Sequence, residues 1–200
     1  MAELGAVVLA AGLSSRMGTR NKLLLPFHGE AILRRVVRAC LTVCDLPVRV
    51  VTGHEADRIA ALLADLPVVL VHNPDYRAGQ MTSLVAGLRA LPKGCDALIA
   101  LGDQPLLDAA ALRLLIEAHS DATRITIPRR GEARGNPILV PAALIPELLA
   151  DETNPGCRKF TRDNPGKLRW FDTDQPAFFA DVDTAGDLLE LTRHDAGAAT

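Results

Sequence analysis

The chain lacks the marks of several protein classes. Its 22 lysine and arginine residues are balanced by 24 aspartate and glutamate residues, giving a formal net charge of −2. Proteins that hold nucleic acid through its backbone carry clustered basic residues, so we expect no nucleic-acid partner. The first residues, MAELGAVVLAAG, have no basic segment, and an apolar run of roughly ten residues is too short to span a membrane. We therefore expect no membrane partner and a buried first strand here.

Metal-binding and disulfide patterns are also missing. The five histidines form no HExxH pair, so a zinc site has no support. The four cysteines (Cys40, Cys44, Cys95 and Cys157) form no CxxC pair. Buried free thiols suit a reducing compartment, and we expect the protein to be cytoplasmic.

What the sequence does contain is a regular alternation of short apolar runs and helical patterns. Such runs are typical of strands covered on both faces, and their alternation with helices implies crossovers and a largely parallel sheet. We expect a three-layer, Rossmann-like α/β fold with a mostly parallel sheet. Strands are expected at residues 6–9, 48–52, 68–72, 97–101, 125–128, 138–140 and 168–171, and helices at 32–44, 57–63, 83–91, 109–119, 141–149, 156–163 and 184–192.

The same pattern predicts the domain organisation and the position of the site. No repeat or linker divides the chain, so residues 1–193 are expected to form one domain and residues 194–200 a disordered tail. In open α/β sheets, ligands bind beyond the carboxyl ends of the strands. The loops at residues 10–25, 73–82 and 102–106 should therefore face one cleft.

The loop after the first strand has the composition of a phosphate-binding loop. Small residues around Gly12 let the backbone approach a ligand closely, and Arg16 and Lys22 supply positive charge for a triphosphate. The loop matches neither GxxxxGK[ST] nor GxGxxG, so a P-loop and a dinucleotide-binding dehydrogenase are disfavoured. The alternative is an exposed surface turn with solvated charges.

This loop also carries a family resemblance. Residues 9–26, LAAGLSSRMGTRNKLLLP, resemble the signature of the nucleotidyltransferase family that includes MobA and MocA, the molybdenum cofactor guanylyl- and cytidylyltransferases. The resemblance implies a nucleotidyltransferase fold in which Arg16 and Lys22 are catalytic and hold the triphosphate. It implies that the nucleotide is bound by those two residues and by Leu9, Ala10, Ala11, Gly12 and Ser14.

The base preference rests on one small difference within the signature. Ala10-Ala11-Gly12, in place of Ala-Gly-Gly, resembles the cytidylyl branch of the family. The Ala11 Cβ would narrow the base pocket towards a pyrimidine, and one methyl group is worth ~1–3 kcal/mol of discrimination. We expect CTP to be preferred over GTP.

The second loop, NPDYRAGQMTSL, resembles the family's NPxxxxGxxxSL segment, where base recognition occurs. The resemblance implies that Gln80 and Ser83 contact the base and that Asn73 shapes the same wall. Ser83 could instead cap the helix that starts nearby.

The third loop places a carboxylate at the end of the most apolar strand. Asp103 beside a phosphate cleft suits Mg²⁺, which prefers oxygen ligands, and the alternative is that it caps a turn before Pro105. LGDQP resembles the family's metal-binding motif, which implies a catalytic Asp103 that binds Mg²⁺. Residues 180–188, ADVDTAGDL, resemble a DxDTPED element with Ala-Gly in place of Pro-Glu. They offer Asp183 as a second metal ligand, unless Asp183 or Thr184 serves only as a helix cap.

The acceptor side is less well matched. Gly135-Asn136-Pro137 resembles the family's G[NH]P motif, and the GDxGAR element is reduced to Gly156 and Arg158. The resemblance implies that Gln104, Asn136 and Arg158 bind the acceptor. The departure from GDxGAR bears on the identity of the acceptor and not on nucleotide binding.

Together these features predict transfer of CMP from CTP to the terminal phosphate of molybdopterin, with release of pyrophosphate and Mg²⁺ as the cofactor. A molybdoenzyme is the expected client. No Ser–His–Asp or Cys–His arrangement is apparent, so no covalent intermediate is expected. Two alternatives stay open: transfer to a sugar phosphate or another phosphorylated metabolite, and a non-catalytic chaperone that binds molybdopterin.

Overall fold

The computed structural model describes residues 2–14, 17, 20–120, 123–150 and 157–198, with only the backbone given for residues 194–198. The strands of the main sheet are β1 (Leu4–Ala10), β4 (Val48–Thr52), β5 (Val68–His72), β6 (Asp96–Leu101), β7 (Ile125–Arg130), β8 (Ala133–Arg134), β9 (Ile138–Val140) and β10 (Leu168–Asp172). The helices are α1 (Ile32–Val43), α2 (Ala56–Leu62), α3 (Gln80–Arg89), α4 (Ala109–Ala118), α5 (Ile145–Ala150), α6 (Cys157–Asp163) and α7 (Ala185–Ala198).

The main sheet is mixed but mostly parallel, as expected. Its order is β10-β7-β9-β6-β1-β4-β5, with β8 paired to β7. The four strands β6, β1, β4 and β5 run parallel to one another, and β10 runs parallel to β7. β9 lies antiparallel between β6 and β7, a reversal that the sequence pattern did not indicate.

Helices cover both faces of the sheet, which gives the expected three layers. Alternate residues of β1 point to opposite faces, because side chains in a strand alternate. Ala6 and Val8 join a buried cluster with residues of α1, α2 and α4. Val7 joins a second cluster with residues of α3, α5 and α6.

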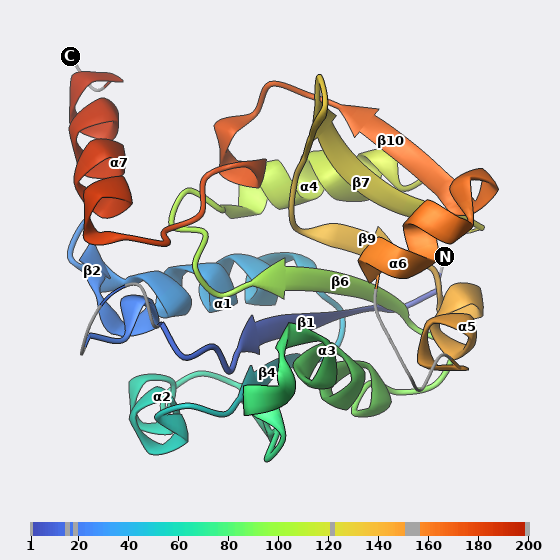
Figure 1. Ribbon diagram of the computed structural model, residues 1–200, viewed down its shortest axis with the longest axis horizontal. Helices are drawn as coiled ribbons and strands as arrows, with labels where there is room; N and C mark the ends of the chain where they lie inside the picture. Colours follow the sequence, from blue (N-terminus) through green and yellow to red (C-terminus); the bar gives the residue numbers. More distant parts are fainter. Residues whose placement is uncertain (1, 15–16, 18–19, 121–122, 151–156, 199–200) are drawn as a thin grey trace.

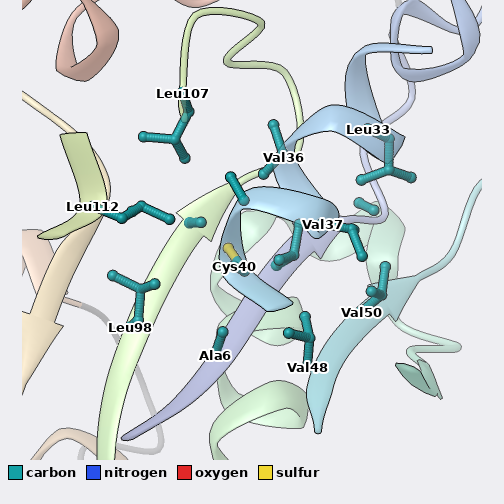
Figure 2. Close-up of a cluster of buried hydrophobic side chains, with 14 of the residues drawn as sticks. Ala6, Leu33, Val36, Val37, Cys40, Val48, Val50, Leu98, Leu107 and Leu112 are labelled. Carbon is teal, nitrogen blue, oxygen red and sulfur yellow. The ribbon is translucent and has the colours of Figure 1, made fainter. Parts of the chain in front are cut away.

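Helix α1 illustrates how the sequence produces this packing. Its apolar residues recur at helical spacing, so one side is fully buried while the arginines lie on the other side. Figure 2 shows Val36, Val37 and Cys40 of α1 in one cluster of buried side chains with Ala6 and Val50 of the central strands. Full burial of each valine is worth ~1.5–3 kcal/mol, which is why this helix is held firmly on the sheet.

The central strands end at one edge of the sheet. The arrows of β1 and β6 point towards the same side in Figure 1, where the β2 (Pro26–Phe27) and β3 (Glu30–Ala31) hairpin and α7 also lie. The loops that follow these strands therefore leave the sheet side by side.

The two strands of the β2–β3 hairpin were not predicted, and the last helix is longer than predicted. The β2–β3 hairpin has only two residues in each strand, joined through His28 and Gly29, which both have positive φ. Strands this short carry no periodic signal. Helix α7 continues to Ala198, beyond the predicted end near Thr192, and so includes most of the segment expected to be a tail. No helix in the described part of the chain is both long and apolar enough to cross a bilayer.

Candidate functional site

One pocket of about 510 Å³ opens at the carboxyl ends of the strands. Its walls come from the β1 end and the loop after it, the start of α3 and the segment before it, the β6 end, and two further segments at α6 and before α7. The expectation that the three loops face one cleft is thus confirmed. The lining residues are Leu9, Ala11, Gly12, Leu13, Ser14, Lys22, Leu23, Tyr76, Arg77, Gly79, Gln80, Ser83, Leu101, Asp103, Arg158, Asp181 and Asp183.

After β1, Ser14 contacts the backbone of Lys22, whose side chain lines the pocket. Ser14 has a positive φ of 52°, and its hydroxyl accepts the Lys22 backbone N–H at 3.3 Å. Asn21 is buried, and its Oδ1 accepts the Leu23 N–H at 3.1 Å as the cap of the short 3-10 helix Lys22–Leu24. Ala10 is buried behind the lining, and Arg16 lies outside the described residues.

Lys22 joins two carboxylates from distant parts of the chain. Its Nζ lies 2.6 Å from Asp103 Oδ2 and 3.0 Å from Asp183 Oδ1. The Lys22 and Asp103 side chains are 14% and 16% exposed, and that of Asp183 is 38% exposed. Burial lowers the pKa of the Lys22 ammonium, but the charges and hydrogen bonds of the two aspartates outweigh burial and raise it above its ordinary value. Lys22 is therefore a cation at neutral pH.

The second carboxylate oxygen of Asp103, Oδ1, is buried. Asp103 Oδ1 has no hydrogen-bond partner among the residues that the structure describes. A buried carboxylate oxygen left unsatisfied is costly, so this atom suits a ligand that the protein alone does not supply. The Asp103 carboxylate does not cap a turn, since its Oδ2 is paired with Lys22.

The segment before α7 is held beside Asp103 by its backbone. The Val182 N–H donates to the Asp103 carbonyl at 3.0 Å. The cap of α7 is formed by Thr184 and Asp187: the Asp187 N–H donates to Thr184 Oγ1, and the Thr184 N–H donates to Asp187 Oδ2 at 2.7 Å. Thr184 therefore caps α7, as one of the alternatives allowed. The Asp183 carboxylate instead accepts a hydrogen bond from Lys22.

The second loop is braced by Asn73. Its Nδ2 donates to Thr82 Oγ1 at 2.8 Å and to Ser83 Oγ at 2.9 Å, while its Oδ1 accepts the Asp75 N–H at 3.0 Å. Asn73 is buried and does not line the pocket; it positions the residues that do. Ser83 is the fourth residue of α3, whose N-cap is Gly79, so Ser83 is not the helix cap. Gln80 lines the pocket at the first position of α3.

Only one of the three predicted acceptor residues reaches the pocket. Arg158 lines it from α6. Gln104 is buried, and its Nε2 donates to the Asn136 carbonyl at 3.0 Å, so these two residues contact each other behind the lining. Arg134, near Asn136, donates to Thr161 Oγ1 at 2.7 Å and ties β8 to α6.

Sequence reasoning missed Asp181, Tyr76 and Arg77 as lining residues. Asp181 lies two residues before Asp183 on an extended segment, and that spacing is the signal that could have found it. Burial, followed by the charge of Asp103, raises the pKa of Asp181. Tyr76 and Arg77 stack, with the guanidinium 5.4 Å from the ring centroid. No periodic pattern predicts such a contact inside a loop.

The pocket has little capacity to hold a metal by itself. Within the described ranges of the chain, no three His, Cys, Asp or Glu side chains are grouped so that they could ligate a metal ion. Asp103, with one oxygen unsatisfied, and Asp183 supply oxygen ligands of the kind that Mg²⁺ prefers, which leaves several positions for water and substrate oxygens.

Comparisons with known proteins agree with this geometry. The family model described as the MobA-like NTP transferase domain matches residues 6–169. The chain is 30% identical over 141 residues to the molybdenum cofactor cytidylyltransferase of Escherichia coli strain K12, covering 70% of this chain and 71% of that protein. It is 29% identical over 192 residues to the nicotine blue oxidoreductase of Paenarthrobacter nicotinovorans, covering 92% and 94% of the two chains.

Among solved structures, a nucleotidyl transferase from Methanothermobacter thermautotroptrophicus superposes with a TM-score of 0.85 at 28% identity, covering 98% of this chain and 99% of that one. The expected Rossmann-like nucleotidyltransferase fold is thereby confirmed. The family match covers most of the sequence and includes the signature loop, Asp103 and the strands that present them. The chain belongs to the MobA-like NTP transferase family.

Proposed function

We propose that this nucleotidyltransferase moves CMP from CTP to the terminal phosphate of molybdopterin and releases pyrophosphate. The observation that carries the proposal is the pocket in which Lys22 and Asp103 meet beneath the loop after β1. A cation for the triphosphate and a carboxylate for its metal ion are the two charges that nucleotidyl transfer requires. The E. coli cytidylyltransferase, at 30% identity, supports the choice of CTP and pterin.

The nucleotide would lie along the loop after β1 and reach towards α3. Ala11, Gly12 and Ser14 line the pocket there and offer backbone groups to the phosphates. Gln80 and Ser83, on the wall braced by Asn73, would bind the base. Lys22 would hold the triphosphate, and the family resemblance gives Arg16 the same task.

Asp103 is the residue best suited to hold Mg²⁺, because its Oδ1 is buried and unsatisfied within the described structure. Asp183 would be the second protein ligand. The ion, when bound, would offset negative charge on the phosphate oxygens during transfer. The remaining ligands would come from the nucleotide and water, as is usual for Mg²⁺ sites.

The chemistry needs no general base from the protein. A phosphate nucleophile is already ionised at neutral pH, so its oxygen forms a bond to the α-phosphorus of CTP while the bond from that phosphorus to the β-phosphate oxygen breaks. The electron pair leaves with pyrophosphate. The side chains act by positioning and charge neutralisation. Arg158 would hold the acceptor, and Gln104 and Asn136 would support the wall on that side.

The cell context follows from the same proposal. Four free cysteines suit the reducing cytoplasm, where a molybdoenzyme would receive the product. A sugar phosphate would be the acceptor in the alternative transfer reaction. In a non-catalytic escort, the Lys22–Asp103 arrangement would have no task.

The test is a panel of pyrophosphate-release assays with CTP, GTP and ATP, each with molybdopterin, with a sugar phosphate or alone. We expect release with CTP and molybdopterin to exceed every other combination. Release that depends on the sugar phosphate and ignores the pterin would overturn the acceptor. Tight pterin binding without release from any nucleotide would favour the escort.

The name of the Paenarthrobacter relative adds a separate check, because it describes an oxidoreductase. The same preparations should be incubated with NADH and NADPH and an electron-accepting dye. Dye reduction together with no pyrophosphate release would overturn nucleotidyl transfer.

A further inference from the structure

We propose that Lys22 is a lock on the metal site: its ammonium occupies Asp103 and Asp183 until a triphosphate draws it away, so that divalent cation and nucleotide bind cooperatively. This inference rests on the proposed function of the pocket. It adds a thermodynamic coupling between two ligands and assigns that coupling to one side chain.

The lock is defined by its contacts. Lys22 Nζ lies 2.6 Å from Asp103 Oδ2 and 3.0 Å from Asp183 Oδ1, which are the carboxylates proposed to bind the ion. A divalent cation on these carboxylates would lie close to the ammonium, and like charges at such separations repel strongly where water is scarce. Lys22 and Asp103 are 14% and 16% exposed, so solvent screens this repulsion poorly.

The lock is built into the fold, unlike a chance surface ion pair. The Ser14 hydroxyl accepts the Lys22 backbone N–H, and Asn21 caps the turn that follows. On the other side, the Val182 N–H binds the Asp103 carbonyl, and the Thr184–Asp187 pair caps α7 next to Asp183. The backbone at Lys22 and the segments that carry Asp103 and Asp183 are thus each fixed by hydrogen bonds.

The protein supplies too few ligands for a divalent cation to displace the Lys22 ammonium from the two aspartates. No group of three ligating side chains exists among the described residues, so a bare cation meets two carboxylates that already share the ammonium of Lys22 and must compete with it for their oxygens. A triphosphate helps in two ways: its oxygens give Lys22 a new anionic partner, and they give the cation additional ligands. Each ligand then favours the state in which Lys22 has left the aspartates, and linkage makes their coupling reciprocal.

The test measures Mn²⁺ binding from the loss of the free-ion signal in electron paramagnetic resonance, with no turnover. Each sample is compared with a protein-free sample holding the same Mn²⁺ and CTP, because CTP itself binds Mn²⁺. The wild type should bind Mn²⁺ weakly alone and about tenfold or more tightly when CTP is present. Lys22→Met should bind Mn²⁺ alone about tenfold more tightly than the wild type, and CTP should no longer produce the wild-type enhancement.

Two variants control for charge and for folding. Lys22→Arg keeps the cation and should stay as weak as the wild type towards Mn²⁺ alone. Lys93→Met removes the same charge from an exposed position and should also behave as the wild type. Circular dichroism would show that each variant is folded.

The lock is overturned if Lys22→Met binds Mn²⁺ alone no better than the wild type does. It is also overturned if Lys22→Arg gains metal affinity as Lys22→Met does. The proposed function fails on a different result, the absence of any CTP binding to the wild type in the presence of Mn²⁺. The comparison without nucleotide would still decide the lock.

Discussion

Helix α3, which lines one side of the pocket with Gln80 and Ser83, rests on the sheet through Gly87, and adding one methyl group there tests the packing. A Cβ at Gly87 would lie 2.3 Å from Val7 Cγ1 and 2.9 Å from Val51 Cγ2. Both valines are fully buried, so neither can move aside freely. Replacing glycine by alanine in a helix gains ~1 kcal/mol, but overpacking a core costs ~1–3 kcal/mol. Because the approach is so close, we expect Gly87→Ala to lose ~1–2 kcal/mol of the free energy of unfolding.

The matched control is Gly186, which lies in α7. A Cβ there would meet only Thr184 Oγ1 at 3.4 Å, an ordinary contact. Gly186→Ala should stabilise the protein by a few tenths of a kcal/mol up to ~1 kcal/mol. Urea denaturation measures both variants, and opposite signs are the expected result. Equal stabilisation by both substitutions would refute the close packing of α3. If α3 is displaced, Gln80 and Ser83 move with it, so the KM for CTP should also rise in Gly87→Ala.

Two further substitutions and one labelling experiment test other contacts. Thr184→Ala removes the cap of α7 and should lower the free energy of unfolding by ~1 kcal/mol in urea denaturation, while an unchanged value would contradict the capping pair. Asn73→Ala removes the brace behind Ser83 and should raise the KM for CTP about tenfold in steady-state kinetics, since a lost buried bond costs ~1–3 kcal/mol; an unchanged KM would count against the brace. Burial raises the pKa of the Cys44 thiol to about 12 and that of Cys157 to about 11. At pH 8 the reactive thiolate of each is then at most ~0.1% of the total, so Ellman's reagent should label both far more slowly in the native protein than in urea, and equal rates would contradict the burial.

The sheet and the site loops could be predicted because their signals are local. The strands at residues 48–52, 68–72 and 138–140 have the predicted bounds, since short apolar runs between helical patterns leave few alternatives. The rule that ligands bind at the carboxyl ends of strands then selected the loops that line the pocket.

What the sequence could not predict depends on contacts between distant residues. The contact between Asp183 and Lys22 joins residues far apart in the sequence, so no local pattern predicts it. It forms where the Val182 N–H donates to the Asp103 carbonyl and holds the segment before α7 at the pocket. The reversal of β9 is a matter of sheet topology. The positions of Gln104 and Asn136 behind the lining are set by a hydrogen bond between them. In each case the motif identifies the residue or strand, and contacts with distant residues determine its position or direction.

The most direct test of the account follows the label from CTP carrying ³²P at its α-phosphate, supplied with Mg²⁺ and molybdopterin. The wild type should transfer label to the pterin. Asp103→Asn should lower kcat about a hundredfold or more while folding normally. Asp172→Asn, which removes an exposed carboxylate paired with Arg129, should transfer label at the wild-type rate. Transfer by Asp103→Asn at the wild-type rate, or no transfer by the wild type to either the pterin or a sugar phosphate, would contradict the central claim that this pocket performs nucleotidyl transfer.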